Sequence, residues 1–187
     1  MLTATYSMVV IEVERDKARG ILHRLQKYLQ TAWKGLQDID FAFLDTLFSK
    51  LAQFDKYFRQ RKIEVHLIPA LRSASMEAQS LLDELDALNS RSEEALQIVA
   101  SQLTSAMEMQ CLQANEICNA MDLYCNSLIA LLEKEEKELL PLAQRLLSIE
   151  EWFAIATRFL AEEGEATSGR RQSLSRARLA DAVPGLN

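Results

Sequence analysis

The sequence contains little that breaks a helix: among 187 residues there are five glycines and three prolines. Long stretches rich in Leu, Ala, Glu, Gln and Lys run between them, and these residues lose little side-chain freedom in a helix. No apolar run approaches the roughly 20 residues of a membrane span. The composition therefore predicts an all-α protein, large enough for one buried core.

Charge and cysteine content exclude several classes of protein. The formal net charge of −6 gives no general attraction for nucleic acid or for an anionic membrane. The start of the chain lacks the basic region of a signal peptide. Three cysteines do not make the even-numbered disulfide framework of a secreted protein. We expect a cytoplasmic protein that binds neither nucleic acid nor membrane.

Hydrophobic periodicity predicts four long helices, at about 8–30, 41–66, 76–106 and 109–147. Short connections between amphipathic helices indicate an antiparallel up-down four-helix bundle. Pro141 should kink the last of the four. The apolar stripe of the second helix contains Leu51, Phe54 and Phe58. The stripe predicted for the first is Val10, Val13, Lys17, Ile21, Leu25 and Leu29, with Lys17 as its exception.

A shorter helix, 149–160, is predicted after the fourth. Ser148 followed by Glu151 has the spacing of a capping box, in which each side chain satisfies a backbone N–H of the other residue. Its apolar side requires a partner surface, so we expect it to cap one end of the bundle. The predicted domain is 1–163, and 164–187 is a polar, basic tail that we expect to be mobile.

The segment 131–143 reads LLEKEEKELLPLA, and an acidic residue and a tryptophan follow at Glu151–Trp152. This pattern resembles the last helix of hemerythrin-like (HHE cation-binding) domains, and weaker matches extend the resemblance over about 8–160. The resemblance implies a bundle in which His and carboxylate side chains hold a pair of irons. The positions that correspond to ligands are Arg15, Arg59, Ile63, Asn89, Leu131 and Glu135.

These six residues do not suit a metal. Leu and Ile have no donor atoms, Arg keeps its proton, and the single carboxylate of Glu135 cannot hold a metal alone. The chain has only two histidines, His23 and His66, so no other alignment supplies the usual ligands. We therefore expect no metal and no other cofactor. Instead, Arg15 or Arg59 should pair with Glu135 across the core, with Asn89 adding a hydrogen bond.

Two other ligand sets are weaker. His23 and His66 could ligate a haem, but surface or boundary histidines are the simpler interpretation. Cys111, Cys118 and Cys125 recur every seven residues and could bind Cu(I), yet small core residues at this spacing are more common.

The sequence contains no Gly-rich phosphate loop, no nucleophile–base pair and no zinc pattern. The favoured function is a metal-free, non-enzymatic module for interaction or regulation, whose partner is a protein or a second copy of the chain. The alternatives are a di-iron protein that responds to oxygen or nitric oxide, and a haem or Cu(I) binder.

Overall fold

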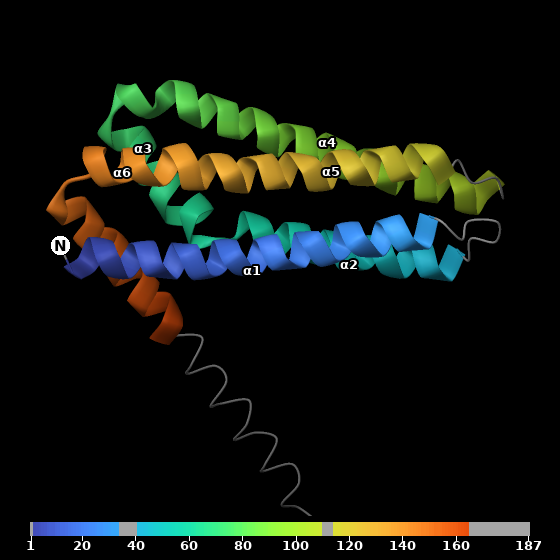
Figure 1. The fold of residues 1–187 in the computed structure, drawn as a ribbon, viewed down its shortest axis with the longest axis horizontal. Coiled ribbons are helices and arrows are strands. Elements are labelled where there is room, and N and C mark those ends of the chain that lie inside the picture. Colours follow the sequence, from blue (N-terminus) through green and yellow to red (C-terminus); the bar gives the residue numbers. More distant parts are fainter. Residues whose placement is uncertain (1, 34–40, 110–113, 165–187) are drawn as a thin grey trace, which may run out of the picture. The chain divides into compact units, whose positions relative to one another are not determined.

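The computed structural model describes residues 2–33, 41–109 and 114–164, and these are helical apart from short turns (Figure 1). The predicted all-α class is confirmed, since the described residues contain no strand. None of the helices in these ranges combines the length and hydropathy of a membrane span. The chain divides into two compact units: Met8–Leu147, and the residues up to Ser7 together with the chain from Ser148 onward.

Helices make up the larger unit almost entirely. In chain order they are α1 (Leu2–Trp33, from residue 8 on), α2 (Phe41–Arg59), the π-turn η1 (Ile63–Leu67), α3 (Ile68–Ala74), the 3₁₀ turn η2 (Met76–Ala78), α4 (Gln79–Met109), α5 (Ala114–Lys134), the π-turn η3 (Glu135–Leu139) and α6 (Leu140–Leu146). The predicted stretches 8–30, 76–106 and 109–147 match helical segments approximately, whereas the predicted helix 41–66 is broken after Arg59 and helical structure continues to Ala74.

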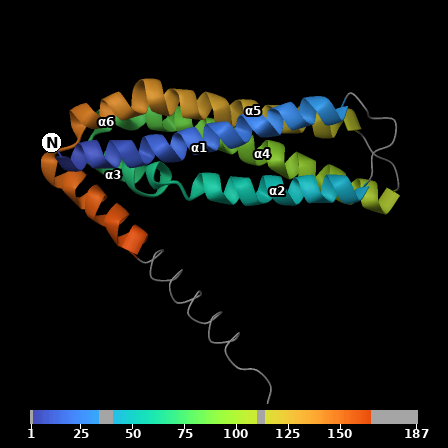
Figure 2. The same cartoon turned by 60° about the horizontal axis from the view of Figure 1, so that its bottom comes forward.

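The long helices of this unit lie side by side (Figures 1 and 2). α4 and α5 run antiparallel, because Glu84 pairs with Lys134 near one end and Gln102 bonds to Glu116 near the other. Gln26 of α1 bonds to Asn126 of α5 at 3.1 Å. The side chains between the helices form an apolar core that includes Leu22, Leu51, Phe58, Leu85, Val99 and Leu128.

The two π-turns occupy equivalent places, each beginning at the same distance ahead of a proline. Pro69 and Pro141 have no N–H and cannot donate to the carbonyl one helical turn earlier. In each case the residue before the proline donates instead to the first residue of the π-turn: Ile68 to the Ile63 carbonyl, and Leu140 to the Glu135 carbonyl. The kink predicted at Pro141 is therefore a π-turn just before it.

The stripe predicted for the first helix is only partly correct: Val10, Ile21 and Leu25 are half-buried, Val13 and Lys17 are exposed, and the side chain of Leu29 is not among those described. Val13 is 64% exposed, while Ile11, Ala18 and Leu22 are buried, and the charged Arg15 is buried with them. Two adjacent faces of this helix are apolar enough to be buried. The buried face carries Arg15, whose guanidinium pairs with Glu136 of η3.

The smaller unit contains a helix over residues 149–164, somewhat longer than the predicted 149–160. Its predicted capping box is confirmed: the backbone N–H of Ser148 donates to the Glu151 carboxylate at 2.7 Å, and the N–H of Glu151 donates to Ser148 Oγ at 3.3 Å. Trp152 and Phe159 are buried. The proposed tail lies, after residue 164, outside the described residues.

Candidate functional site: a buried arginine–carboxylate cluster

An ion pair between Arg61 and Glu135 lies in the core of the larger unit. The two guanidinium NH₂ groups donate to the two carboxylate oxygens of Glu135, at 2.8 and 2.6 Å. Arg61 is 1% exposed and Glu135 is 0% exposed. A bidentate pair of this kind fixes both groups geometrically, and burial makes each dependent on the other for its charge compensation.

A break in the second helical stretch positions Arg61. α2 ends at Arg59, and Arg61 forms the bend before η1. The backbone N–H and the Nε–H of Arg61 both donate to the carbonyl of Phe58, at 3.3 and 3.0 Å, so the side chain is held against the end of the broken helix. Its guanidinium carbon lies 3.7 Å from the centre of the Phe58 ring. The break also frees the N–H of Lys62, which donates to Glu14 of α1 at 2.8 Å.

Two further carboxylates surround the Arg61 cation. Glu64 accepts a hydrogen bond from Arg61 at 3.2 Å, and Glu14 lies close enough to act on the same charge. Burial alone would lower the pKa of Arg61, but the charges of Glu135, Glu64 and Glu14 outweigh it and raise that pKa. Burial raises the pKa of Glu64, against the opposing effects of Arg61 and of a hydrogen bond with Asn89. The cluster thus contains one permanent cation, Arg61, beside three carboxylates, and Arg61 alone cannot neutralise all three.

Arg59 does not pair with Glu135, which corrects one of the two predicted pairings. Its guanidinium binds Asp55 with two hydrogen bonds at 3.0 and 3.2 Å, and forms an ion pair with Glu93 at 3.0 Å. Tyr124 of α5 donates to Asp55 at 3.2 Å. Arg59 also donates to Asn89 at 3.4 Å, so Asn89 bonds to Arg59 and to Glu64 rather than to Glu135.

Arg15 does not reach Glu135 either. Its nearest acidic partners are Glu136 and Asp16, both at 3.6 Å, and Glu136 is shared with Arg19 at 2.6 Å. Arg15 is nevertheless 8% exposed, and its buried Nε has no hydrogen-bond partner. α1 therefore supplies two cations, Arg15 and Arg19, to Glu136, the residue that follows Glu135 in η3.

The remaining two positions of the resemblance are apolar and buried. Ile63 is 1% exposed and Leu131 is 0% exposed. Ile63 and Glu135 are the first residues of the two π-turns, so they occupy equivalent positions in their helices. Glu135 places a carboxylate at one of these equivalent positions, and Ile63 places a hydrocarbon side chain at the other.

These residues do not fit a metal ion. Both carboxylate oxygens of Glu135 accept hydrogen bonds from Arg61, and a guanidinium beside them repels a second cation. Within the described ranges, no group of three or more His, Cys, Asp or Glu side chains has the arrangement of a metal site.

Sequence reasoning missed Arg61, although a signal for it exists. Leu51, Phe54 and Phe58 are spaced by three and four residues along one face, and the next position on that face is Arg61. Alignment to the resembled family pointed to Arg59 instead. Glu14 and Glu64 carried no comparable signal, because only the break after α2 brings both of them to Arg61.

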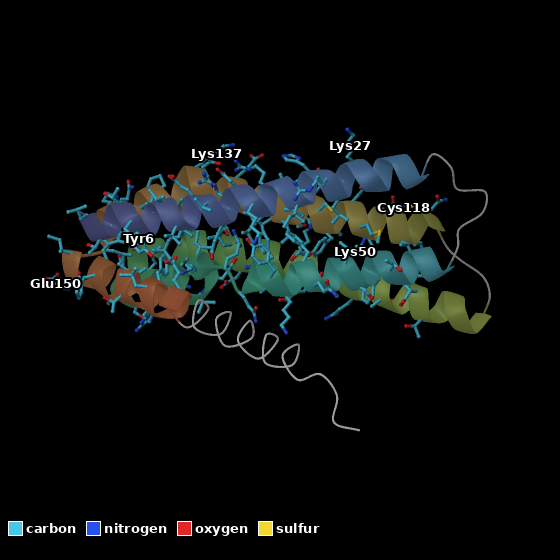
Figure 3. All side chains as sticks on the ribbon, turned by 90° about the horizontal axis from the view of Figure 1, so that it is seen from below. Tyr6, Lys27, Lys50, Cys118, Lys137 and Glu150 are labelled. Carbon is cyan, nitrogen blue, oxygen red and sulfur yellow. The ribbon has the colours of Figure 1, made fainter. Side chains whose placement is uncertain are left out.

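The other candidate ligands are dispersed. His23 is exposed and His66 is buried. Cys118 is half-buried and Cys125 is buried on α5, while Cys111 lies outside the described residues (Figure 3). Burial raises the pKa of Cys118, and it raises that of Cys125 to about 12, with a further contribution from the charge of Asp122.

A raised thiol pKa has a measurable consequence, since the thiolate is the reactive form. We expect Cys125 to resist alkylation by iodoacetamide at pH 8 in the folded protein, and to react completely after denaturation in urea. Chymotryptic cleavage after Tyr124 separates Cys118 from Cys125, so mass mapping reports the two cysteines individually and labelling of Cys118 provides an internal comparison. Rapid labelling of Cys125 in the native protein would contradict its burial.

No family model, curated protein or solved structure matches this chain. The resemblance to hemerythrin-like domains therefore stays a prediction, carried by the residues of 131–152 and by the positions aligned with them.

Proposed function

We propose that this chain is a metal-free four-helix bundle of the hemerythrin-like type, in which the Arg61 guanidinium takes the place of a metal cation. The observation that carries this proposal is the bidentate pair of Arg61 with Glu135. Glu135 is the one potential ligand kept among the six aligned positions, and a side-chain cation compensates its charge.

The physical argument concerns the cost of a buried carboxylate. A carboxylate in an apolar core is strongly destabilising unless it is paired and hydrogen-bonded. In a metal protein the ion supplies that compensation. Here Arg61 supplies it from the same chain, and Ile63 and Leu131 are buried apolar side chains at positions where the family has ligands. The folding of such a core does not depend on the binding of a metal ion.

The charged groups of the cluster are buried and paired with one another, which favours a role for the surface of the bundle. We therefore propose a non-enzymatic role in interaction or regulation for this chain. Among the described residues no group of three or more His, Cys, Asp or Glu side chains could hold a metal ion, which argues against the di-iron alternative.

Metal analysis of the full-length protein tests the proposal. After anaerobic incubation with excess Fe(II) and desalting, we expect no stoichiometric iron and no absorption band of an oxo-bridged pair. The melting temperature should be the same with and without a chelator. Parallel titrations with haem and Cu(I) should show no stoichiometric binding. About two irons per chain in the wild type, lost in Glu135→Gln, would overturn the proposal.

A further inference from the structure

The outer face of α4 borders a groove that the core does not use. This groove lies between α4 and α5–η3 and has a volume of about 840 Å³. Ala87, Leu88 and Ala130 provide its apolar surface, and Lys137 points outward at its edge (Figure 3). Further along α4, Ile98 is 43% exposed.

The α4 side of this groove has the spacing of a coiled-coil seam. Positions alternate by three and four residues along one face: Glu84, Ala87, Arg91, Glu94, Ile98 and Ser101. We call this set the α4 seam. The core-facing residues Leu85, Ala95 and Val99 lie on another side of the same helix and are buried. The seam is therefore a second, outward stripe, and its middle consists of one cation and one anion.

The two charges at the middle of the seam have no partner among the described residues. Arg91 and Glu94 are both exposed, and within the described residues neither forms an ion pair or a hydrogen bond. Their neighbours across the groove differ in this respect. Lys134 pairs with Glu84 at 2.6 Å and Lys137 pairs with Glu133 at 2.9 Å.

We propose that the α4 seam binds the α4 seam of a second copy of this chain, in antiparallel register. A two-fold axis between Arg91 and Glu94 places Arg91 of one copy opposite Glu94 of the other, twice. The same axis places Ala87 opposite Ile98 and Glu84 opposite Ser101. Each small Ala87 side chain therefore packs opposite a large Ile98 side chain, and each Arg91 lies opposite a Glu94. No like charges of the seam face each other.

Self-complementarity of this kind is what an isologous dimer requires, because one surface must match itself after rotation. The charges read cation-then-anion along α4, so an antiparallel second copy presents the matching order. Charged residues within a seam also fix its register, at some cost in stability. The dimer should accordingly dissociate on dilution. This inference goes beyond the proposed function and does not depend on the Arg61–Glu135 pair, which lies in the core.

Charge reversal within the seam tests the inference on the full-length protein. Analytical ultracentrifugation of the wild type over a concentration series should show a monomer that converts to a dimer. Arg91→Glu and Glu94→Arg should each sediment as monomers at concentrations where the wild type is dimeric. The double variant Arg91→Glu/Glu94→Arg should recover the dimer. An equimolar mixture of the two single variants should form a heterodimer, since one seam is then acidic and the other basic.

Lys50→Glu is the matched control, because it reverses an exposed charge on α2 outside the groove; it should dimerise like the wild type. Circular dichroism should show the same helical content for all variants. A wild type that stays monomeric throughout would overturn the proposal. So would single variants that dimerise as the wild type does, or a double variant and a mixture that both remain monomeric.

Discussion

Replacing Glu135 by Gln is expected to lower the free energy of unfolding by roughly 3–5 kcal/mol, because the buried Arg61 cation would lose its bidentate carboxylate and keep only the weaker contact with Glu64 and the charge of Glu14. Arg61→Met should have an effect of similar size for the converse reason. The double variant should lose much less than the sum of the two, since it removes both members of the bidentate pair together. Urea denaturation of the four proteins gives the coupling energy directly.

Arg59 provides a matched control for this cycle. It is also an arginine near the end of α2, but it pairs with Asp55 and Glu93. Combining Arg59→Met with Glu135→Gln should therefore give nearly additive losses. Equal coupling of Glu135 to Arg59 and to Arg61, or no coupling to Arg61, would contradict the assigned pair.

Phe159→Ala is the second substitution with a large expected effect. Phe159 is 0% exposed in the helix over 149–164, so its removal leaves a cavity and should cost about 3–5 kcal/mol. This loss would be a large part of the stability of a typical domain, which is about 5–15 kcal/mol. Thermal and urea unfolding, followed by circular dichroism, measure it.

Phe153 serves as the comparison within the same helix, because it is 61% exposed. Phe153→Ala should change the free energy of unfolding by only about 0.5 kcal/mol, as expected for a surface substitution. A loss from Phe153→Ala as large as that from Phe159→Ala would show that the buried and exposed sides of this helix have been assigned wrongly.

The sequence by itself determined the features that depend on neighbouring residues. Few glycines and prolines and a helical period predicted an all-α chain, and the Ser148–Glu151 spacing predicted a capping box that the structure contains. Pro141 predicted an interruption, since a residue without an N–H cannot continue the hydrogen bonds of a helix. The expectation that Glu135 lies in the core came from the resemblance of 131–143 to the last helix of hemerythrin-like domains, and Glu135 is indeed buried.

Only the tertiary structure decided which cation meets Glu135. The prediction assumed one unbroken helix over 41–66, whereas the chain breaks after Arg59 and continues through a π-turn. Each residue of a helix advances the side-chain direction by about 100°, so a break and a wider turn change which face points inward. Arg61 still continues the stripe of Phe54 and Phe58, but beyond it Val65 is 47% exposed, while Ile63 and Leu67 are buried. The pairing of charges between helices depends on that change of face. The periodicity of the sequence does not predict the change, because it assumes an unbroken helix.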